Sequence, residues 1–293
     1  MTSDLLKVTT WNVASLRAAW DHDLPHYIEI SKPDIFCVQE TKLHIDTKPH
    51  IDSFKLPGYN GYFFHSMKKG YSGTAIYTKI KPISVKPSFN DEEGRAITME
   101  FSNFYLVNTY VVNAGENLKR LDYKMQIFMP KLQSHLHELA KKKPVFWTGD
   151  INIAHNPIDI WKTEGHEEIA GFTPVERKWL SEFLQEGYID CFRHFHPDIQ
   201  EFSFFNFRGQ SKLKNQGWRI DYFITQTQTI EQLGVSDCTI EKGIDGSDHQ
   251  PVSIFMSREK ALSPNDALVE KQKVELLSFT TTTKLDSFFA KKN

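Results

Sequence analysis

The chain has 293 residues, of which 40% are hydrophobic and 25% are charged, with a formal net charge of −2. This length and composition suit one large globular domain or two small ones, with a core that needs no disulfide or metal to stabilise it. The net charge gives no indication of a nucleic-acid partner, but carboxylates around a metal can cancel a basic binding face in the total.

Secretion and membrane insertion are both disfavoured by the sequence. Its three cysteines (Cys37, Cys191 and Cys238) are odd in number and far apart, which favours a reducing compartment. The N-terminal segment lacks the apolar stretch of a signal peptide, and no run approaches the roughly 20 apolar residues of a membrane span. We therefore expect a soluble intracellular protein.

Short segments with strand character, separated by turns, occupy most of the first 255 residues. We expect strands at Leu6–Val13, Asp34–Gln39, Tyr59–Phe64, Thr74–Thr78, Ala96–Phe101, Phe104–Val111, Pro144–Thr148, Arg219–Thr225 and Pro251–Phe255.

Two helices are also predicted. Over Lys119–Ala140, leucine, methionine and phenylalanine residues recur at steps of three and four. A second helix starts after Thr173, with Pro174 at its first position and Glu176 completing a capping box. Strands mixed with helices over this length predict an α/β (α+β) sandwich, in which two packed sheets are flanked by helices.

The character of the sequence changes after Met256, where scattered charges, a proline and a threonine run replace the periodic patterns. We therefore expect one catalytic domain over residues 1–257 and a flexible tail over residues 258–293.

Polar residues follow or precede several of the expected strands, where a sandwich can gather them. They are Asn12, Glu40, Tyr110, Asn113, Asp150, Asn152, Asp221, Asp248 and His249. Taken singly, such residues more often cap turns or face solvent. Ser247, Asp248 and His249 are adjacent, and neighbouring side chains on an extended chain point to opposite faces, so they do not form a hydrolase triad by themselves.

The motifs WNVASLRA, VQETK, GYSGTAI, EGRAIT, YVVNAG, GDINIAH, GFTPVER, GWRIDYF and GSDH occur in this order over nearly the whole domain. In this order they resemble the exonuclease III family of apurinic/apyrimidinic (AP) endonucleases. That family is the DNA-repair branch of the endonuclease/exonuclease/phosphatase superfamily and has a DNase I-like fold. GFTPVER, YVVNAG and GWRIDYF are typical of the AP endonuclease branch, whereas QE, GDxN and SDH are shared across the superfamily.

The resemblance implies a role for each polar residue. The implied catalytic residues are Tyr110, Asn113, Asp150, Asn152, Asp221 and His249. The implied metal ligands, for Mg²⁺ with Mn²⁺ as a substitute, are Glu40, Asp150, Asn152, Asp248, His249 and Asn12. In this scheme Glu40 is the principal ligand, Asp150 activates the attacking water, and Asp221 holds the imidazole of His249.

Substrate contacts follow from the same resemblance. Phe204, Trp218 and Ile220 match the small apolar pocket that receives an extruded abasic sugar, although plain core packing would also place them near strands. The resemblance also implies phosphate contacts, for which Arg95, Arg120, Lys42 and Lys68–Lys69 are the candidates.

Two positions depart from the family pattern. Ala14 stands where the family usually carries Asp or Asn beside the metal, and a methyl group cannot hydrogen-bond a metal-bound water. Such a loss costs about 10–100-fold in metal affinity. Phe205 replaces the usual Trp, so the shape of the pocket could differ.

The segment TTKLDSFF (residues 282–289) resembles the motif by which repair proteins dock on the sliding clamp PCNA. Its apolar residues are Leu285, Phe288 and Phe289, and Thr282 replaces the usual leading Gln. The alternative is a tail that folds back on its own domain. A nuclear location is expected from this motif alone.

The sequence therefore predicts a Mg²⁺-dependent AP endonuclease that cuts double-stranded DNA 5′ to an abasic site and acts as a monomer. Some 3′-phosphodiesterase or 3′→5′ exonuclease activity is expected. Two alternatives stay open, namely an enzyme that mainly processes blocked 3′ ends and a DNA- or clamp-binding protein with a weakened active site.

Overall fold

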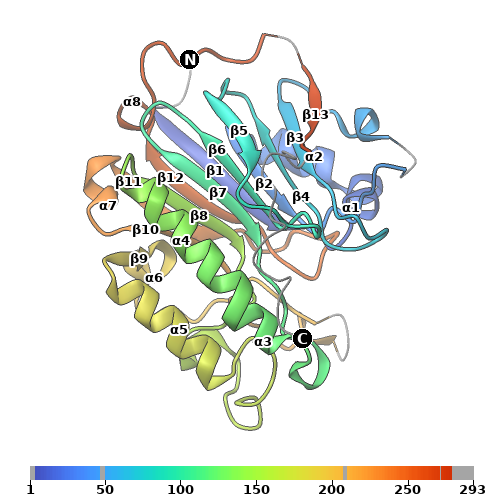
Figure 1. Ribbon diagram of the computed structural model, residues 1–293, viewed down its shortest axis with the longest axis vertical. Helices are drawn as coiled ribbons and strands as arrows, with labels where there is room; N and C mark the ends of the chain where they lie inside the picture. Colours follow the sequence, from blue (N-terminus) through green and yellow to red (C-terminus); the bar gives the residue numbers. More distant parts are fainter. Residues whose placement is uncertain (1–3, 47–49, 207–209, 271, 279–293) are drawn as a thin grey trace, which may run out of the picture.

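The computed structural model describes residues 4–46, 50–206, 210–270 and 272–278. Two β-sheets pack face to face, and helices cover the outer face of each sheet (Figure 1). This is the expected sandwich. Within the described residues, none of the helices has the length and apolarity needed to cross a membrane.

The larger sheet has seven strands in the order β11-β12-β1-β2-β4-β3-β13. Their bounds are β1 Leu5–Asn12, β2 Ile35–Gln39, β3 Asn60–Phe64, β4 Thr74–Thr78, β11 Val235–Ile240, β12 Val252–Ser257 and β13 Val274–Leu276. The smaller sheet has six strands in the order β5-β6-β7-β8-β10-β9. Their bounds are β5 Ser84–Pro87, β6 Ala96–Glu100, β7 Tyr105–Tyr110, β8 Val145–Asp150, β9 Tyr188–Asp190 and β10 Asp221–Gln226.

Helices lie between the strands along the chain. The α-helices are α1 Leu16–His22, α2 Leu24–Ser31, α3 Leu121–Tyr123, α4 Met129–Ala140, α5 Pro174–Gln185, α6 Cys191–Phe195, α7 Thr229–Gln232 and α8 Arg258–Ala261. Single turns of 3₁₀-helix are η1 Ile51–Phe54, η2 Glu116–Leu118 and η4 Pro157–Asp159, and η3 Lys124–Phe128 is a π-helical turn.

Side chains along each central strand point alternately to the two faces of its sheet, so the core forms three layers. In β2, Ile35 and Cys37 face the smaller sheet, whereas Phe36 and Val38 face α1 and α2. In β8, Phe146 faces the larger sheet while its neighbour Trp147 packs against α4 and α5. Both central strands are therefore buried on both faces, and the side chains packed between the sheets fix the position of one sheet against the other.

Every expected strand is present, with ends within two residues of the expected ones. The expected helix over Lys119–Ala140 is interrupted, because η3 inserts a π-turn between α3 and α4. The sequence pattern missed β5, β9, β11 and β13, which are short and carry polar residues on one face.

Part of the segment expected to form a tail, as far as Leu277, packs on the domain instead. Residues 258–261 form α8, and β13 pairs in parallel with β3 through residues 274–276. Leu277 is buried and its N–H bonds to the Phe63 carbonyl. A sheet edge presents unpaired backbone groups, so a short segment of weak periodicity can add to it as a strand.

Candidate active site

Four strand ends converge at one end of the sandwich. β1 runs parallel to β2, and β7 runs parallel to β8, so the carboxyl ends of each pair lie together. These ends carry Asn12, Glu40, Tyr110 and Asp150, one on each strand or directly after it. Because the two sheets face each other, side chains from both meet between them.

Asn12 is fully buried and links the two sheets. Its Nδ2 donates to Glu40 Oε1 at 3.0 Å and to Asp150 Oδ2 at 2.9 Å. Its Oδ1 accepts the backbone N–H of Ala14 at 3.0 Å. With both ends of its amide engaged, Asn12 aims the two carboxylates, and its expected role as a metal ligand stays a prediction.

A second pair of strand ends brings in Asp221 and His249. Asp221 opens β10 directly opposite Asp150 in the antiparallel register. His249 Nδ1 lies 2.8 Å from Asp221 Oδ2, and its Nε2 lies 3.8 Å from Asp150 Oδ2. All three side chains are buried, and one ligand atom from each could share a metal ion.

Burial and charge set the protonation of these groups. Burial, reinforced by the negative charges of Asp221 and Glu40, raises the pKa of Asp150 to about 7. Burial acts to lower the pKa of His249, but the carboxylates of Asp221, Asp150 and Asp248 together raise that pKa to about 10. The site therefore holds an imidazolium beside a carboxyl that can exchange a proton near neutral pH.

The buried polar side chains at these strand ends form what we call the polar floor, and Asn152 and Asn113 extend it. Asn113 Nδ2 donates to Asn152 Oδ1 at 2.7 Å, and Asn152 Nδ2 donates to the Val111 carbonyl at 2.9 Å. Nearby, burial and the charges of Glu40 and Asp150 hold the pKa of Tyr110 well above its usual range. The Tyr110 hydroxyl therefore keeps its proton and can donate it in a hydrogen bond.

Backbone strain is concentrated at the same strand ends. Glu40, Asn152 and Ala14 have φ values of 53°, 54° and 54°, in the left-handed region. This region costs most non-glycine residues energy and is enriched at functional sites. In each case the kinked backbone ends a strand and turns the following side chains, which the sequence pattern does not reveal.

A buried ion pair supports Asn152 from behind. Lys124 lies in the π-turn η3, and its Nζ donates to the Asn152 carbonyl at 2.8 Å and to Glu176 Oε1 at 2.6 Å. Both charged side chains are 0% exposed. Glu176 also accepts from Gly171 N and Thr173 Oγ1, so the pair joins the polar floor to the loop before α5. Sequence reasoning missed Lys124.

A pocket of about 430 Å³ opens above the polar floor. All nine polar residues expected at strand ends lie at this pocket or directly behind it. The pocket is lined by Glu40, Tyr110, Asn113, Asp150, Asn152, Asp248, His249, Phe204, Trp218, Ile220, Trp161, His166, Ile169, Ala170, Gly171, Asn206, Ser211 and Gln216. Asn12 and Asp221 lie behind this surface, bonded to its carboxylates and its imidazole.

The expected apolar pocket residues form one wall. Trp218 is bridged to Phe204 on one side and to Ile160 on the other, and Phe204 is bridged to His249. The ring centroids of Phe204 and His249 are 4.9 Å apart. The apolar wall therefore touches the imidazole.

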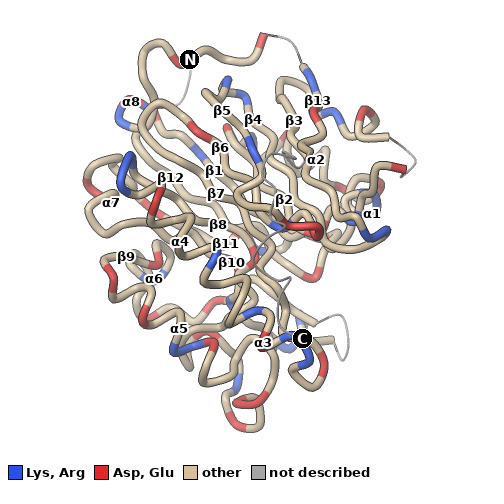
Figure 2. Tube along the Cα trace, viewed as in Figure 1, with Lys and Arg blue, Asp and Glu red and all other residues tan. Residues whose placement is uncertain are grey.

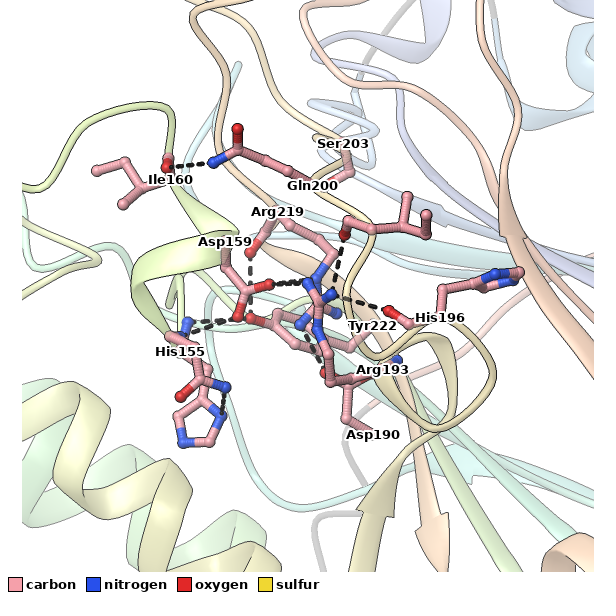
Figure 3. A network of polar contacts seen from close by, with 12 residues as sticks. His155, Asp159, Ile160, Asp190, Arg193, His196, Gln200, Ser203, Arg219 and Tyr222 are labelled. Carbon is pink, nitrogen blue, oxygen red and sulfur yellow. Dashed lines mark hydrogen bonds and ion pairs between the residues drawn. The ribbon is translucent and has the colours of Figure 1, made fainter.

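Figure 3 shows the buried network that fixes this wall. Arg219 is fully buried and donates to Asp159 at 2.8 Å and to Asp190 at 2.6 Å. Its guanidinium carbon lies 4.4 Å from the ring centre of Tyr222. Because Asp159 precedes Ile160 and Arg219 follows Trp218, this network holds the bridge between those two residues in place.

The expected phosphate contacts divide into two groups. The Arg95 side chain is only 2% exposed, and it bonds Glu93, Tyr71 and the Tyr110 carbonyl. It supports Tyr110 from behind, so the expected contact between Arg95 and phosphate does not agree with the structure. The rings of Tyr71 and Tyr110 enclose its guanidinium group.

The other cations remain accessible. The Arg120 side chain is 30% exposed and bonds Glu93, and Lys42 is 35% exposed and pairs with Glu40 at 2.9 Å. Lys68 and Lys69 are exposed on a turn beyond the larger sheet. The expected clamp-binding residues Leu285, Phe288 and Phe289 lie outside the described residues.

The donor set at the polar floor fits a hard cation. Glu40, Asp150 and Asp248 offer carboxylate oxygens at one pocket, and Asp221 Oδ1 is a buried oxygen without a hydrogen-bond partner among the described residues. Hard divalent cations prefer such oxygen ligands. Burial opposes ionisation of Glu40, but Lys42 and Asn12 hold its pKa below the usual value, which keeps it a carboxylate.

Comparisons with known proteins agree with this geometry. Residues 9–249 match the profile of the Endonuclease/Exonuclease/phosphatase family. The chain is 36% identical over 258 residues to a DNA-(apurinic or apyrimidinic site) endonuclease of Dictyostelium discoideum, covering 86% of this chain and 70% of the relative. It is 37% identical over 261 residues to an exodeoxyribonuclease of Bacillus subtilis, covering 86% of this chain and 100% of the relative.

A solved structure is similar over a comparable length. An AP endonuclease from Leishmania major superposes with a TM-score of 0.81 at 30% sequence identity, covering 87% of this chain and 88% of that one.

Proposed function

The chain belongs to the endonuclease/exonuclease/phosphatase family, and we propose that it is a DNA-repair AP endonuclease with exonuclease activity. It cuts the phosphodiester on the 5′ side of an abasic site and leaves a 3′-hydroxyl and a 5′-deoxyribose phosphate. The observation that carries this proposal is the contact between two sets of residues. One set is the polar floor, in which Asn12 bonds Asp150 and Asp221 bonds His249. The other set is the apolar wall, which contacts the floor where the ring of Phe204 packs against His249.

The residues of the floor divide the chemistry among themselves. Asp150, with its pKa near neutral, takes the proton of the attacking water, and Asn152 orients that water. His249, charged and held by Asp221, contacts a non-bridging phosphate oxygen and stabilises its growing negative charge. The protonated Tyr110 hydroxyl donates a hydrogen bond to the phosphate from the other side.

Mg²⁺ is the cation that we propose for this site, with Mn²⁺ as a substitute. Glu40 would hold it, with Asp150 or Asp248 as a further carboxylate, since Mg²⁺ prefers one or two carboxylates and keeps several waters. When bound, the cation supplies charge stabilisation to the phosphoryl oxygens and the departing oxygen.

The apolar wall supplies selectivity. Flipping a nucleotide out of the duplex costs a few kcal/mol, and least where no base is stacked. An abasic sugar therefore reaches Phe204, Trp218 and Ile220 most easily. Activity at 3′ ends is the second candidate, supported by the name of the Bacillus subtilis relative.

The experiment is cleavage of a duplex with one tetrahydrofuran abasic analogue, next to a duplex with a blocked 3′ end, while Mg²⁺ is titrated. We expect rapid incision of the abasic duplex, and its loss in Glu40→Ala. Preferential trimming of the 3′ end would favour the second candidate. No cleavage at any Mg²⁺ or Mn²⁺ concentration would leave only a DNA-binding protein.

We also propose that residues 282–289 bind the sliding clamp PCNA, on the sequence pattern alone. Such a partner would accompany a nuclear location. Clamp capture by the full chain should be lost in the double variant Leu285→Ala, Phe288→Ala. Unchanged capture by that variant would contradict this proposal.

A further inference from the structure

Beyond the apolar wall of Phe204, Trp218 and Ile220, a second group of aromatic side chains lines the same pocket. His166 lies edge-on between two tryptophans, 5.8 Å from Trp218 and 5.7 Å from Trp161 between ring centroids. Together with the contact between Phe204 and His249, a row of rings leads from the catalytic imidazole to Trp161. Trp161 is 36% exposed, so part of its ring is open to a ligand.

The loop that carries these residues, residues 161–169, is held in place before any ligand binds. Trp161 N bonds the Gly217 carbonyl at 3.0 Å, and successive turns close with His166 N on Thr163 O and Ile169 N on His166 O. The Arg219 network (Figure 3) fixes Asp159, two residues before the loop. A pre-ordered wall loses little entropy when a ligand stacks on it.

The charge of this loop restricts what can lie against it. Glu164, Glu167 and Glu168 are exposed there beside one cation, Lys162, which pairs with Glu164 at 3.2 Å, so the loop is negative on balance (Figure 2). Carboxylates repel the phosphates of a continuous strand but accept hydrogen bonds from the amino groups of bases. A base at a strand end, with no further phosphate beyond it, therefore fits this rim better than an uninterrupted strand.

We propose that loop 161–169 forms a base-stacking subsite, in which the nucleobase of a 3′-terminal nucleotide packs on Trp161 and His166. This subsite rests on the proposed function and deepens it, because the residues of the polar floor would then catalyse hydrolysis of the bond to that nucleotide. Water adds to phosphorus, the P–O3′ bond breaks, and the 3′ oxygen leaves with a proton. The products are a nucleoside 5′-monophosphate and a new 3′-hydroxyl.

The test compares two substrates in the full chain, an internal abasic duplex and a duplex with a mismatched 3′-terminal nucleotide. Base–aromatic stacking contributes enough that Trp161→Ala should slow removal of the terminal nucleotide by about 10-fold. His166→Ala should act in the same direction. Abasic incision by Trp161→Ala should fall by a smaller factor than removal of the terminal nucleotide, because an abasic sugar has no base to stack on Trp161.

Trp161→Phe is the matched control, since it keeps a ring at the same position and should retain most of the activity. Thermal unfolding of each variant checks the fold. Equal losses on both substrates, or no loss on either, would overturn the subsite. Wild-type protein that incises abasic DNA but removes no 3′ nucleotide would also overturn the subsite, and would leave the AP endonuclease part of the proposed function standing.

A second readout does not need cleavage. With Glu40→Gln in the background, a 3′-terminal 2-aminopurine should lose fluorescence on binding, because it stacks on Trp161. Adding Trp161→Ala should restore the fluorescence, and identical quenching in both proteins would contradict the stacking. If the wild-type protein cut neither substrate, the proposed function would fail, and this quenching would still report on the subsite.

Discussion

The floor of the pocket and the loop at its rim are built in opposite ways. The floor consists of buried polar groups at strand ends, such as Asn12, Asp150 and His249, and each is fixed by hydrogen bonds from another strand. The rim loop carries Trp161 and His166 on an irregular segment with exposed carboxylates. The strand ends of the sandwich therefore position the groups that carry out the chemistry. The rim loop, which is attached to the sandwich but is not part of it, determines which substrate fits.

This difference predicts how variants should behave. A change in the floor should affect every substrate by the same factor, because the same bond chemistry is used each time. A change in the rim should alter the ratio between substrates while leaving one of them nearly unaffected.

The largest effect is expected for Asp150→Asn. Removing the group that takes a proton from water should lower the rate of abasic incision by roughly 10³-fold. Removal of a 3′ nucleotide should fall by a similar factor in single-turnover assays. A loss on one substrate alone would show that the two reactions do not share the floor.

The buried pair behind the floor should matter for folding. Lys124→Met leaves Glu176 as an unpaired buried charge and should lower the free energy of unfolding by about 3–5 kcal/mol. The double variant Lys124→Met, Glu176→Gln should recover part of this loss, because no charge is then left uncompensated. Urea denaturation measures both, and equal stability of the single and double variants would argue against the ion pair.

A change at Ala14 should strengthen the floor. Its φ of 54° suits Asn better than Ala, and an amide there can hydrogen-bond a metal-bound water. Ala14→Asn should lower the Mg²⁺ concentration for half-maximal incision by about 10-fold. Ala14→Gly, which relaxes the backbone without adding a polar group, should leave that concentration unchanged.

The smallest effect is expected at the rim. Replacing Glu164, Glu167 and Glu168 together by Gln removes three negative charges near the DNA and should tighten binding of an abasic duplex roughly 2–5-fold at low salt. Fluorescence anisotropy at rising salt should show this gain fading. A gain that persisted at high salt would indicate a cause other than repulsion.

The sequence predicts much of the floor and little of the rim. Asn12, Glu40 and Asp150 each close a strand of buried residues, and a polar residue at that point is visible in the pattern. Trp161 and His166 lie in a segment without periodicity, so nothing in the pattern relates them to Trp218. The sandwich itself was predictable because its central strands are short, apolar and regularly spaced.

Buried charges were the hardest feature to predict. Lys124 and Arg95 have the sequence surroundings of surface cations, yet both are enclosed and paired. Their burial depends on partners far away in the chain, such as Glu176 for Lys124. β13 was missed for a similar reason, because its pairing with β3 depends on a free sheet edge and not on its own three residues.

The most direct test of the account is the origin of the oxygen in the products of natural abasic-site cleavage in H₂¹⁸O. Attack of water on phosphorus predicts one ¹⁸O atom in the phosphate group of the 5′-deoxyribose phosphate and an unlabelled 3′-hydroxyl, both read by fragment mass spectrometry that separates the phosphate from the exchangeable C1′ oxygen. An unlabelled phosphate with a 3′-unsaturated sugar would mean β-elimination. That result would contradict the roles of Asp150 and His249 in hydrolysis.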